Sequence, residues 1–442
     1  MPWRTRSWLG MRWLWMVCAR LAEMPIQPIE AIAAALFAAA LLHTFATKLF
    51  EGLAHRHPRH AGLFHLLGEV EVVFGFWAML LIVAMALVNG GRQAVEYAQS
   101  RQYTEPLFVF VVMVVAASRP VLELVQSLLR AAAAWLPGRA EVAEIWLALA
   151  LVPLLGSLIT EPAAMTLAAL MLAPRVFRAG MPEWKKYAAL GVLFVNVSIG
   201  GTLTSYAAPP VLMVASAWNW DSAFMLREFG WKAAIAVLVN ASGMVALLAA
   251  DVRPVAPAAP GEERRRVPLA VSLIHLGFLA AVVATAHYPA IFLGLFLFFL
   301  GFTQAYARHQ DPLLLKEGLL VGFFLAGLVV LGGMQQWWLQ PLVSGLAPLA
   351  LFFSALALTA ITDNAALTYM GSLIPDLSAD SRSMLVAGAV AGGGLTVIAN
   401  APNPAGIALL RRGFNDQSIG AGGLLAGALA PTTVACVAFL LL

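Results

Sequence analysis

Two stretches of the chain place an acidic residue in the middle of long apolar segments. The first, "LITEPAAMTLAALML" (158–172), contains Glu161, and the second, "AITDNAALTYMGSLI" (360–374), contains Asp363. In both, one threonine precedes the acid and another follows it five residues later. An ionised carboxylate that is far from water is costly, so it is expected to take up a proton or to hold a cation. A carboxylate that alternates between these states could exchange protons for a metal ion.

The polar neighbours of the two acids offer oxygen ligands rather than thiolate or imidazole groups. Oxygen ligands favour a hard cation such as Na⁺. We therefore predict an ion site with Asp363 and Asn364 as Na⁺ ligands, and an equivalent ion or proton site in the first stretch. The ion-binding candidates are Thr362, Asp363, Asn364, Thr368, Gly394, Thr396, Asn400 and Asn403, and the equivalent candidates are Thr160, Glu161, Thr166, Thr202 and Thr204.

A further acidic pair, Glu69 and Glu71, lies on the apolar stretch 62–90. These residues are candidates for a proton pathway. The alternative is that they lie at the level of the lipid headgroups, where water solvates them. No cofactor is expected, because Na⁺ and H⁺ would be transported rather than retained.

The composition of the chain indicates a lipid environment. Of its 442 residues, 61% are hydrophobic and 11% are charged, and the mean hydropathy is +0.83. Soluble domains carry about 25% charged residues. The net charge of +4 comes from arginines in short loops, which indicates membrane topology and not nucleic-acid binding. The expected partners are therefore the lipid bilayer and small inorganic ions.

The apolar stretches predict an all-α polytopic membrane protein, because a membrane helix needs about 20 apolar residues. Two regions, 141–173 and 341–375, are too long for one crossing and have polar centres, so we predict re-entrant hairpins there. Two others, 187–217 and 384–410, contain Gly/Pro-rich centres and are predicted to be broken helices, whose freed carbonyls can bind cations. Single spans are predicted over 29–52, 62–90, 105–130, 229–251, 268–286, 288–306, 312–333 and 417–440.

The order of these elements repeats, with three spans, a hairpin, a broken span and a last span in each half. We predict an N-terminal helix (1–28), a first repeat (29–251), a cytoplasmic linker (252–267) and a second repeat (268–442). A hairpin that enters and leaves on one side gives each repeat an odd number of crossings, so the repeats are expected to be inverted. The distribution of Lys and Arg predicts a cytoplasmic N-terminus and an external C-terminus. Residues 7–22 are predicted either to span the membrane or to lie in its interface.

The second hairpin and the second break resemble the ion transporter superfamily. "SALALTAITDNAALTYMGSL" and "GGGLTVIANAPNPAG" are similar to the branch that contains NhaD-type sodium/proton antiporters and arsenite efflux pumps. The resemblance implies two inverted repeats and a transport domain that moves like an elevator against a scaffold, usually in a homodimer. It also implies a multi-pass protein of the inner (cytoplasmic) membrane.

By position, Asp363 and Asn364 correspond to the cation-binding hairpin tip of that superfamily. Thr160 and Glu161 correspond to the tip in the other half. The first tip departs from the superfamily pattern, because it has Glu-Pro where Asp-Asn or a serine–asparagine–threonine signature is expected. The first break, "SYAAPP", lacks the amides of "IANAPN". The first-half site is therefore either a proton site or degenerate.

Three functions are compatible with these patterns. The first is sodium/proton antiport. The second is cation-coupled transport of an anion or small organic acid, held at helix N-termini near 202–206 and 395–400. The third is a membrane scaffold or a membrane-embedded enzyme. A nucleophile–base pair, an HExxH metal motif and a nucleotide-binding loop are all absent from the sequence, so we expect no enzyme and no catalytic residues.

Overall fold

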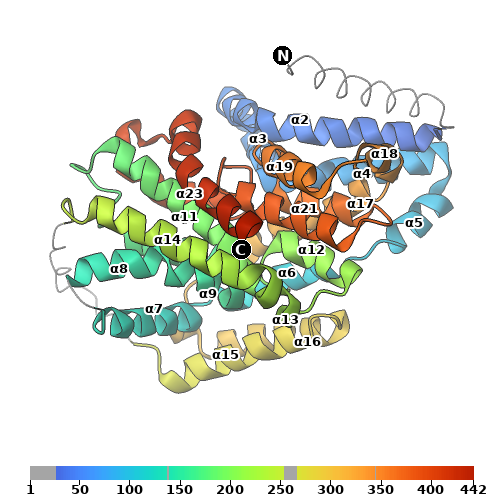
Figure 1. Ribbon diagram of the computed structural model, residues 1–442. Coiled ribbons are helices and arrows are strands. Elements are labelled where there is room, and N and C mark those ends of the chain that lie inside the picture. The colour runs from blue at the N-terminus through green and yellow to red at the C-terminus, as the bar shows by residue number, and fades with distance from the viewer. Residues whose placement is uncertain (1–25, 137–138, 253–265, 344) are drawn as a thin grey trace, which may run out of the picture. The chain divides into compact units, whose positions relative to one another are not determined.

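The computed structural model describes residues 26–136, 139–252, 266–343 and 345–442. The regular elements in these ranges are all helices (Figure 1). Six of the described helices are long and apolar enough to cross a membrane, or up to eight if two bent helix pairs count as one span each. The chain is therefore an all-α polytopic membrane protein, which confirms the predicted fold class. Most of the predicted helix 1–28 and of the predicted linker 252–267 lies outside the described residues.

The chain forms two compact units. The described part of the first unit comprises residues 26–102, 323–343, 345–351 and 369–385. Within it, α4 packs on α2 and on the end of α17, where Phe74 contacts Phe324 and the backbone of Gly75 meets that of Gly327. Its helices are α2 (Pro28–Arg56), α3 (Ala61–Gly68), α4 (Val70–Val88), α5 (Gly91–Gln99), α18 (Gln336–Val343) and parts of α17 (Leu315–Gly332), α19 (Pro348–Thr359), α20 (Asn364–Ser372) and α21 (Ala379–Gly392).

The predicted span over 62–90 is shorter in the structure, because α3 is a separate helix and the candidate membrane span covers Glu71–Val88 of α4. Glu69, between them, has an extended backbone (φ −80°, ψ 121°), and Glu71 lies in the first turn of α4. Carboxylates are favoured at the N-terminus of a helix because the helix dipole places partial positive charge there. Both acids thus have a structural reason for their position, and a proton pathway through them stays a prediction.

The second unit comprises residues 103–322, 352–368 and 386–442. It contains Glu161, Asp363 and both Gly/Pro-rich centres. Its further helices are α6 (Thr104–Ala116), α7 (Arg119–Ala133), α8 (Ala140–Leu149), α9 (Leu151–Ile159), α10 (Glu161–Leu172), α11 (Glu183–Gly200), α12 (Pro209–Trp218), α13 (Ser222–Met225), α14 (Trp231–Leu248), α15 (Leu269–Ala284), α16 (Pro289–Ala305), α22 (Asn403–Leu410) and α23 (Ala421–Leu441). Short 3₁₀ or π turns connect some of them, among them Gly201–Leu203 after α11.

The predicted single span over 105–130 is not a straight helix in the structure. It is a pair of helices, α6 and α7, which meet at an angle of 62°. Ser118 has an extended backbone, and Pro120 in the first turn of α7 has no N–H to continue a helix from α6. Along α7, Val121 and Leu129 are buried, whereas Ser127 and Arg130 are exposed. This two-sided pattern is typical of a helix that lies along a membrane surface.

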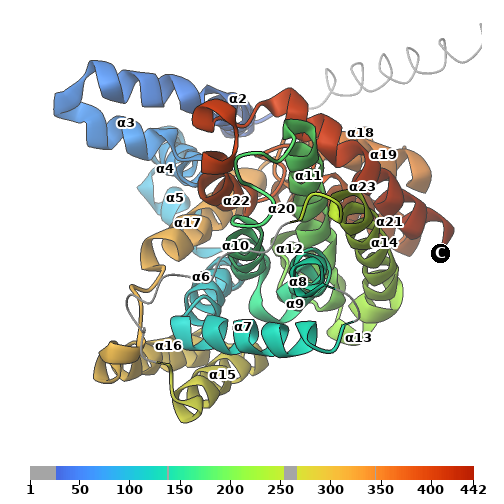
Figure 2. The same ribbon diagram turned by 90° about the vertical axis from the view of Figure 1, so that its left-hand side faces the viewer.

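The predicted spans over 268–286 and 288–306 form α15 and α16, with 16 and 17 residues. Both are shorter than the roughly 20 residues that cross a bilayer without help. They pack on each other and on α6, and α15 also packs on α7 (Figure 2).

Helices α11 and α23 lie side by side in both views (Figures 1 and 2). Glycines make this approach possible. A Cβ at Gly191 would overlap the backbone of Gly427, and a Cβ at Gly427 would overlap the carbonyl of Tyr187. Backbone therefore packs on backbone here, as at other helix interfaces built from small residues.

Candidate functional site

The first acidic stretch forms a hairpin that turns at the predicted position. Helix α9 ends at Ile159, α10 begins at Glu161, and α10 packs back on both α9 and α8. Thr160, between the two helices, has a φ of 74° and a ψ of 151°. This conformation is rare for a β-branched residue and costs about 1–3 kcal/mol. Pro162 fixes the start of α10, and Glu161 is fully buried at its first position.

The second acidic stretch forms a similar turn, between α19 and α20. Asp363 occupies the position before the helix, where its Oδ1 accepts hydrogen bonds from the backbone N–H of Ala365 (2.8 Å) and Ala366 (3.1 Å). Asp363 is therefore an N-cap, whereas Glu161 is the first residue inside its helix and makes no cap. The cap takes one oxygen of the Asp363 carboxylate. The Glu161 carboxylate is left to point away from its own helix.

Each hairpin is fastened to the helix break of its own half by a threonine hydroxyl. Thr204 Oγ1 donates to the carbonyl of Ser157 over 2.7 Å, and Thr396 Oγ1 donates to the carbonyl of Ala360 over 2.9 Å. The two bonds are close counterparts in the two halves. Both threonines were predicted to bind the ion, and both use their hydroxyl protons to hold a hairpin.

Other contacts join the hairpin of one half to the broken helix of the other. Asn400, in the second break, donates from Nδ2 to Oε2 of Glu161 over 2.9 Å. Asn364, at the second tip, donates from Nδ2 to Ser198 Oγ in α11 over 3.5 Å. Polar residues within 157–204, 359–368 and 390–403 thus form one buried polar cluster, which we call the tip cluster.

The tip cluster contains six buried side-chain oxygens that have no hydrogen-bond partner among the described residues. The side-chain nitrogen Nδ2 of Asn403 donates to the carbonyls of Gly393 and Thr396. Asn403 Oδ1 therefore faces away from these carbonyls. An unpartnered buried acceptor costs about 1–3 kcal/mol, and a cation would satisfy several at once. The six atoms are Thr160 Oγ1, Glu161 Oε1, Thr359 Oγ1, Asn364 Oδ1, Asn400 Oδ1 and Asn403 Oδ1.

Residues 28–442 match the protein family described as "Putative Na+/H+ antiporter". The chain belongs to this family. The match covers both hairpins, both breaks and every described helix. No curated protein matches the chain. A family of this description is a family of transporters, which agrees with the predicted class and with a bilayer and small ions as partners.

Several residues that were predicted to bind the ion have local structural roles instead. Most of them donate a hydrogen bond to a backbone carbonyl three or four residues earlier. Gly394 packs closely on Val195 of α11, so its missing side chain serves the approach of the break to that helix. The hydroxyls donate to backbone carbonyls, with Thr166 bonded to Pro162, Thr202 to Ile199, Thr362 to Leu358 and Thr368 to Ala365. The predicted residues that the tip cluster brings together are Thr160, Glu161, Thr204, Asp363, Asn364, Thr396, Asn400 and Asn403.

Three polar residues of the tip cluster were not among the predicted ligands. Ser157 Oγ donates to the carbonyl of Gly200 (2.7 Å) and accepts from the N–H of Leu203 (2.9 Å). Ser198 Oγ donates to the carbonyl of Val390 (2.7 Å) and receives the amide of Asn364. The third is Thr359. Ser157 and Thr359 each stand four residues before the acid of their hairpin, and this shared spacing could have identified them.

Proposed function

We propose that the protein exchanges Na⁺ for H⁺ across a membrane as a secondary active antiporter. The observation that carries this proposal is the set of six unpartnered oxygens around two buried carboxylates. Carboxylate, amide and hydroxyl oxygens are the ligands that a hard cation prefers. The described residues contain no group of three His, Cys, Asp or Glu that could hold a metal ion. Two carboxylates among neutral oxygens are therefore better suited to a monovalent cation.

The two carboxylates have different roles in the proposed exchange. Two backbone amides solvate Asp363, so this side chain supplies the lasting negative charge for the cation. Glu161 receives one side-chain amide, from Asn400, and its second oxygen has no described partner. In a buried site this carboxylate requires either a proton or a cation beside it. Protons and Na⁺ then compete for Glu161, and this competition couples their movements.

Two inverted repeats and an elevator mechanism would place both hairpin tips and both helix breaks in one unit of the chain. The second unit contains both hairpin tips and both breaks, as one moving transport body requires. Within it, the first hairpin bonds to the second break and the second hairpin bonds to the first broken helix. Such reciprocal pairing is expected when two inverted repeats meet at a site near the bilayer midplane. In the proposed assembly the protein is a homodimer.

The proposed orientation places the loops after α7, α10 and α14 in the cytoplasm. These loops touch one another, because Arg139 Nη2 donates to the carbonyl of Val252 and Arg178 Nη2 donates to that of Asp251. Lys185 forms an ion pair with Asp251 at 2.5 Å. A concentration of Lys and Arg at one end of the helices is typical of the cytoplasmic side of an inner membrane. The N-terminus is then cytoplasmic and the C-terminus external.

A cavity of about 320 Å³ gives ions access from the opposite end of the second unit. Its walls include Glu105, Asp221 and His287, together with Ser205 and Tyr206 of the first break. Thr204, which precedes these two break residues, is bonded to the first hairpin. Acidic groups at the mouth of a cavity raise the local concentration of cations. The cavity therefore supports an external entrance that leads toward the tip cluster.

Flux measurements in proteoliposomes test the proposed function. An imposed gradient of Na⁺, Li⁺ or K⁺ should change the internal pH, with Na⁺ the effective ion. Asp363→Asn should abolish this change, and Thr166→Val, whose hydroxyl is bonded to its own helix, should preserve it. Both variants should elute as folded protein in size-exclusion chromatography.

Two results would count against antiport. One is an unchanged Na⁺-driven pH signal in Asp363→Asn. The other is a signal that requires an added anion or organic acid, which would support the alternative of cation-coupled substrate transport. A positively charged side chain for such an anion is lacking near the described tip cluster, where Glu161 and Asp363 are the buried charged residues.

A further inference from the structure

A second cavity, of about 580 Å³, lies between the outer face of α7 and the first turn of α15. Its polar wall includes Ser127 and Arg130 of α7, Arg266, and Ser272 of α15. Leu124 and Leu269 form part of its apolar wall. The cavity is separate from the tip cluster, since the two have no residue in common. In the proposed orientation it opens at the cytoplasmic surface of the membrane.

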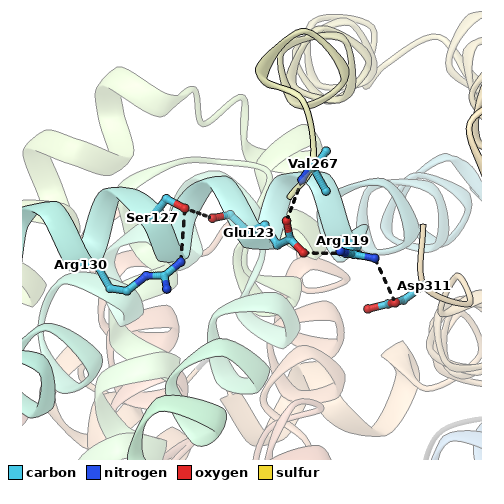
Figure 3. A network of polar contacts seen from close by, with 6 residues as sticks. All are labelled: Arg119, Glu123, Ser127, Arg130, Val267 and Asp311. Atoms are coloured by element: carbon cyan, nitrogen blue, oxygen red, sulfur yellow. Dashed lines mark hydrogen bonds and ion pairs between the residues drawn. The ribbon is translucent and has the colours of Figure 1, made fainter. Parts of the chain in front are cut away.

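Among the described residues that line this cavity, the one carboxylate, Glu123, already has an arginine and a backbone N–H as partners. Figure 3 shows Glu123 between Arg119 and Val267. Arg119 Nε lies 2.6 Å from Glu123 Oε1, and the backbone N–H of Val267 donates to Oε2 over 3.3 Å. Arg119 also lies 3.9 Å from Asp311. Glu123 therefore does not repel an anion as an isolated carboxylate would.

Two guanidinium groups in the cavity wall have no carboxylate partner among the residues that the structure describes. Arg130 Nη2 contacts Ser127 Oγ at 3.5 Å (Figure 3). Arg266 forms neither a hydrogen bond nor an ion pair with another described residue. Ser272, also in the cavity wall, has a residue exposure of only 4%. Two guanidinium groups with a buried hydroxyl between helices are well suited to bind a phosphate group.

The apolar residues around the cavity favour the phosphate group of a lipid over a free phosphate ion. Leu128 and Leu269 are each 62% exposed, and Leu273, one turn along α15 from Leu269, is 54% exposed. Leucines this exposed on an apolar helix of a membrane protein are in contact with acyl chains. A molecule that fills the cavity and also covers these leucines needs a phosphate group and long hydrocarbon chains.

We propose that this cavity binds the headgroup of an anionic phospholipid. The phosphate lies against Arg130 and Arg266 and accepts a hydrogen bond from Ser272, while the acyl chains run along Leu269 and Leu273. Basic pockets at the cytoplasmic side of membrane helices bind anionic headgroups in this way. The bound lipid ties the surface helix α7 to the start of α15. This site is independent of the proposed Na⁺/H⁺ exchange.

Thermal unfolding of the full chain in detergent tests the proposal, with tryptophan fluorescence as the signal. Phosphatidylglycerol should raise the melting temperature in a saturable way, and phosphatidylcholine should not. In the Arg130→Gln/Arg266→Gln variant, half-saturation should require at least about tenfold more phosphatidylglycerol, which corresponds to ~1.4 kcal/mol. The control variant Arg92→Gln/Arg227→Gln loses the same charge at other exposed positions and should respond like the unmodified chain.

Three outcomes would overturn the proposal. They are an equal response to phosphatidylcholine, an equal response of the Arg130→Gln/Arg266→Gln variant, and a full response to inorganic phosphate alone, which would assign the cavity to a soluble anion. If the double variant fails to fold, Arg266→Gln alone serves the same purpose. Arg266 is exposed and precedes α15, so this change leaves the helices intact and should still weaken the response.

Discussion

Asn400 donates a hydrogen bond from Nδ2 to Oε2 of Glu161 over 2.9 Å, although the two residues are 239 positions apart in the chain. The contact joins the hairpin of the first half to the helix break of the second. Because Asn400 Oδ1 then faces away from the carboxylate, the pair presents one carboxylate oxygen and one amide oxygen, both without a described partner. Neither half of the chain could assemble this arrangement alone.

Glu161→Gln should abolish the Na⁺-driven pH change in proteoliposomes. The glutamine has the shape of the glutamate but cannot exchange a proton at neutral pH. The variant should melt at the same temperature as the unmodified chain or higher, because an uncharged side chain avoids the cost of a buried charge. Proton-coupled flux at the unmodified rate would remove Glu161 from the coupling mechanism.

Ser157→Ala and Thr359→Val form a matched pair at equivalent positions of the two hairpins. Ser157→Ala should lower the free energy of unfolding by about 1–3 kcal/mol, because it removes the partner of a buried N–H and of a buried carbonyl. Thr359→Val removes a hydroxyl that has no partner among the described residues, so stability should hold while the apparent Na⁺ affinity falls. Equal Na⁺ affinity in Thr359→Val and the unmodified chain would exclude Thr359 as a ligand.

Gly201→Ala should weaken Na⁺ binding without straining the backbone. Gly201 has a φ of −72°, which any residue can adopt, but a Cβ there would overlap the Glu161 side chain. The control is Gly243→Ala in α14, where a Cβ meets nothing within 4 Å. This control should keep full transport and gain up to about 1 kcal/mol of helix stability. Similar Na⁺ dependence in the two alanine variants would show that Na⁺ binding does not require the Glu161 side chain to keep its position.

Lowering the pH should weaken apparent Na⁺ binding, because protons occupy the carboxylate that Na⁺ requires. If one proton competes with one Na⁺, the half-maximal Na⁺ concentration should rise by about tenfold for each pH unit in the acidic range. Na⁺ should also raise the melting temperature at high pH and lose this effect at low pH. Glu161→Gln should remove the pH dependence. A Na⁺ dependence that is the same at every pH would contradict competition.

The proposed orientation predicts opposite labelling at Ala223 and Arg412. In a chain whose native Cys18 and Cys436 are replaced by serine, Ala223→Cys should react with an impermeant maleimide added to right-side-out vesicles. Arg412→Cys should react after the membrane is permeabilised. Both positions are exposed. Reversed labelling would invert the topology, and labelling of both from one side would exclude it.

The sequence was sufficient to predict the membrane class, the family, both hairpin turns and both helix breaks, because clustered polar and Gly/Pro residues disfavour a simple helical crossing of the bilayer. It did not predict the bend before α7. Residues 105–130 are apolar enough overall to resemble one membrane span. The alternation of buried apolar and exposed polar residues along α7 is visible only when the segment is divided at Ser118.

The tip cluster was only partly predictable. Helix α10 begins at Glu161 itself, whereas α20 begins one residue after Asp363. Because of this difference of one position, Asp363 caps its helix, whereas the Glu161 carboxylate makes no cap and contacts Asn400. Ser157 and Ser198 were missed because a lone serine in an apolar helix often bonds only to its own backbone.

The glycine contacts between α11 and α23 have a consequence for any shortened form of the chain. Because Gly191 and Gly427 bring two backbones together, no layer of side chains separates the final helix from the one that carries Asn196 and Ser198. A chain that stopped before Ala421 would expose the back of α11 to lipid along bare main chain. Helix α23 therefore covers one side of the helix that carries Ser198, and its removal should destabilise α11.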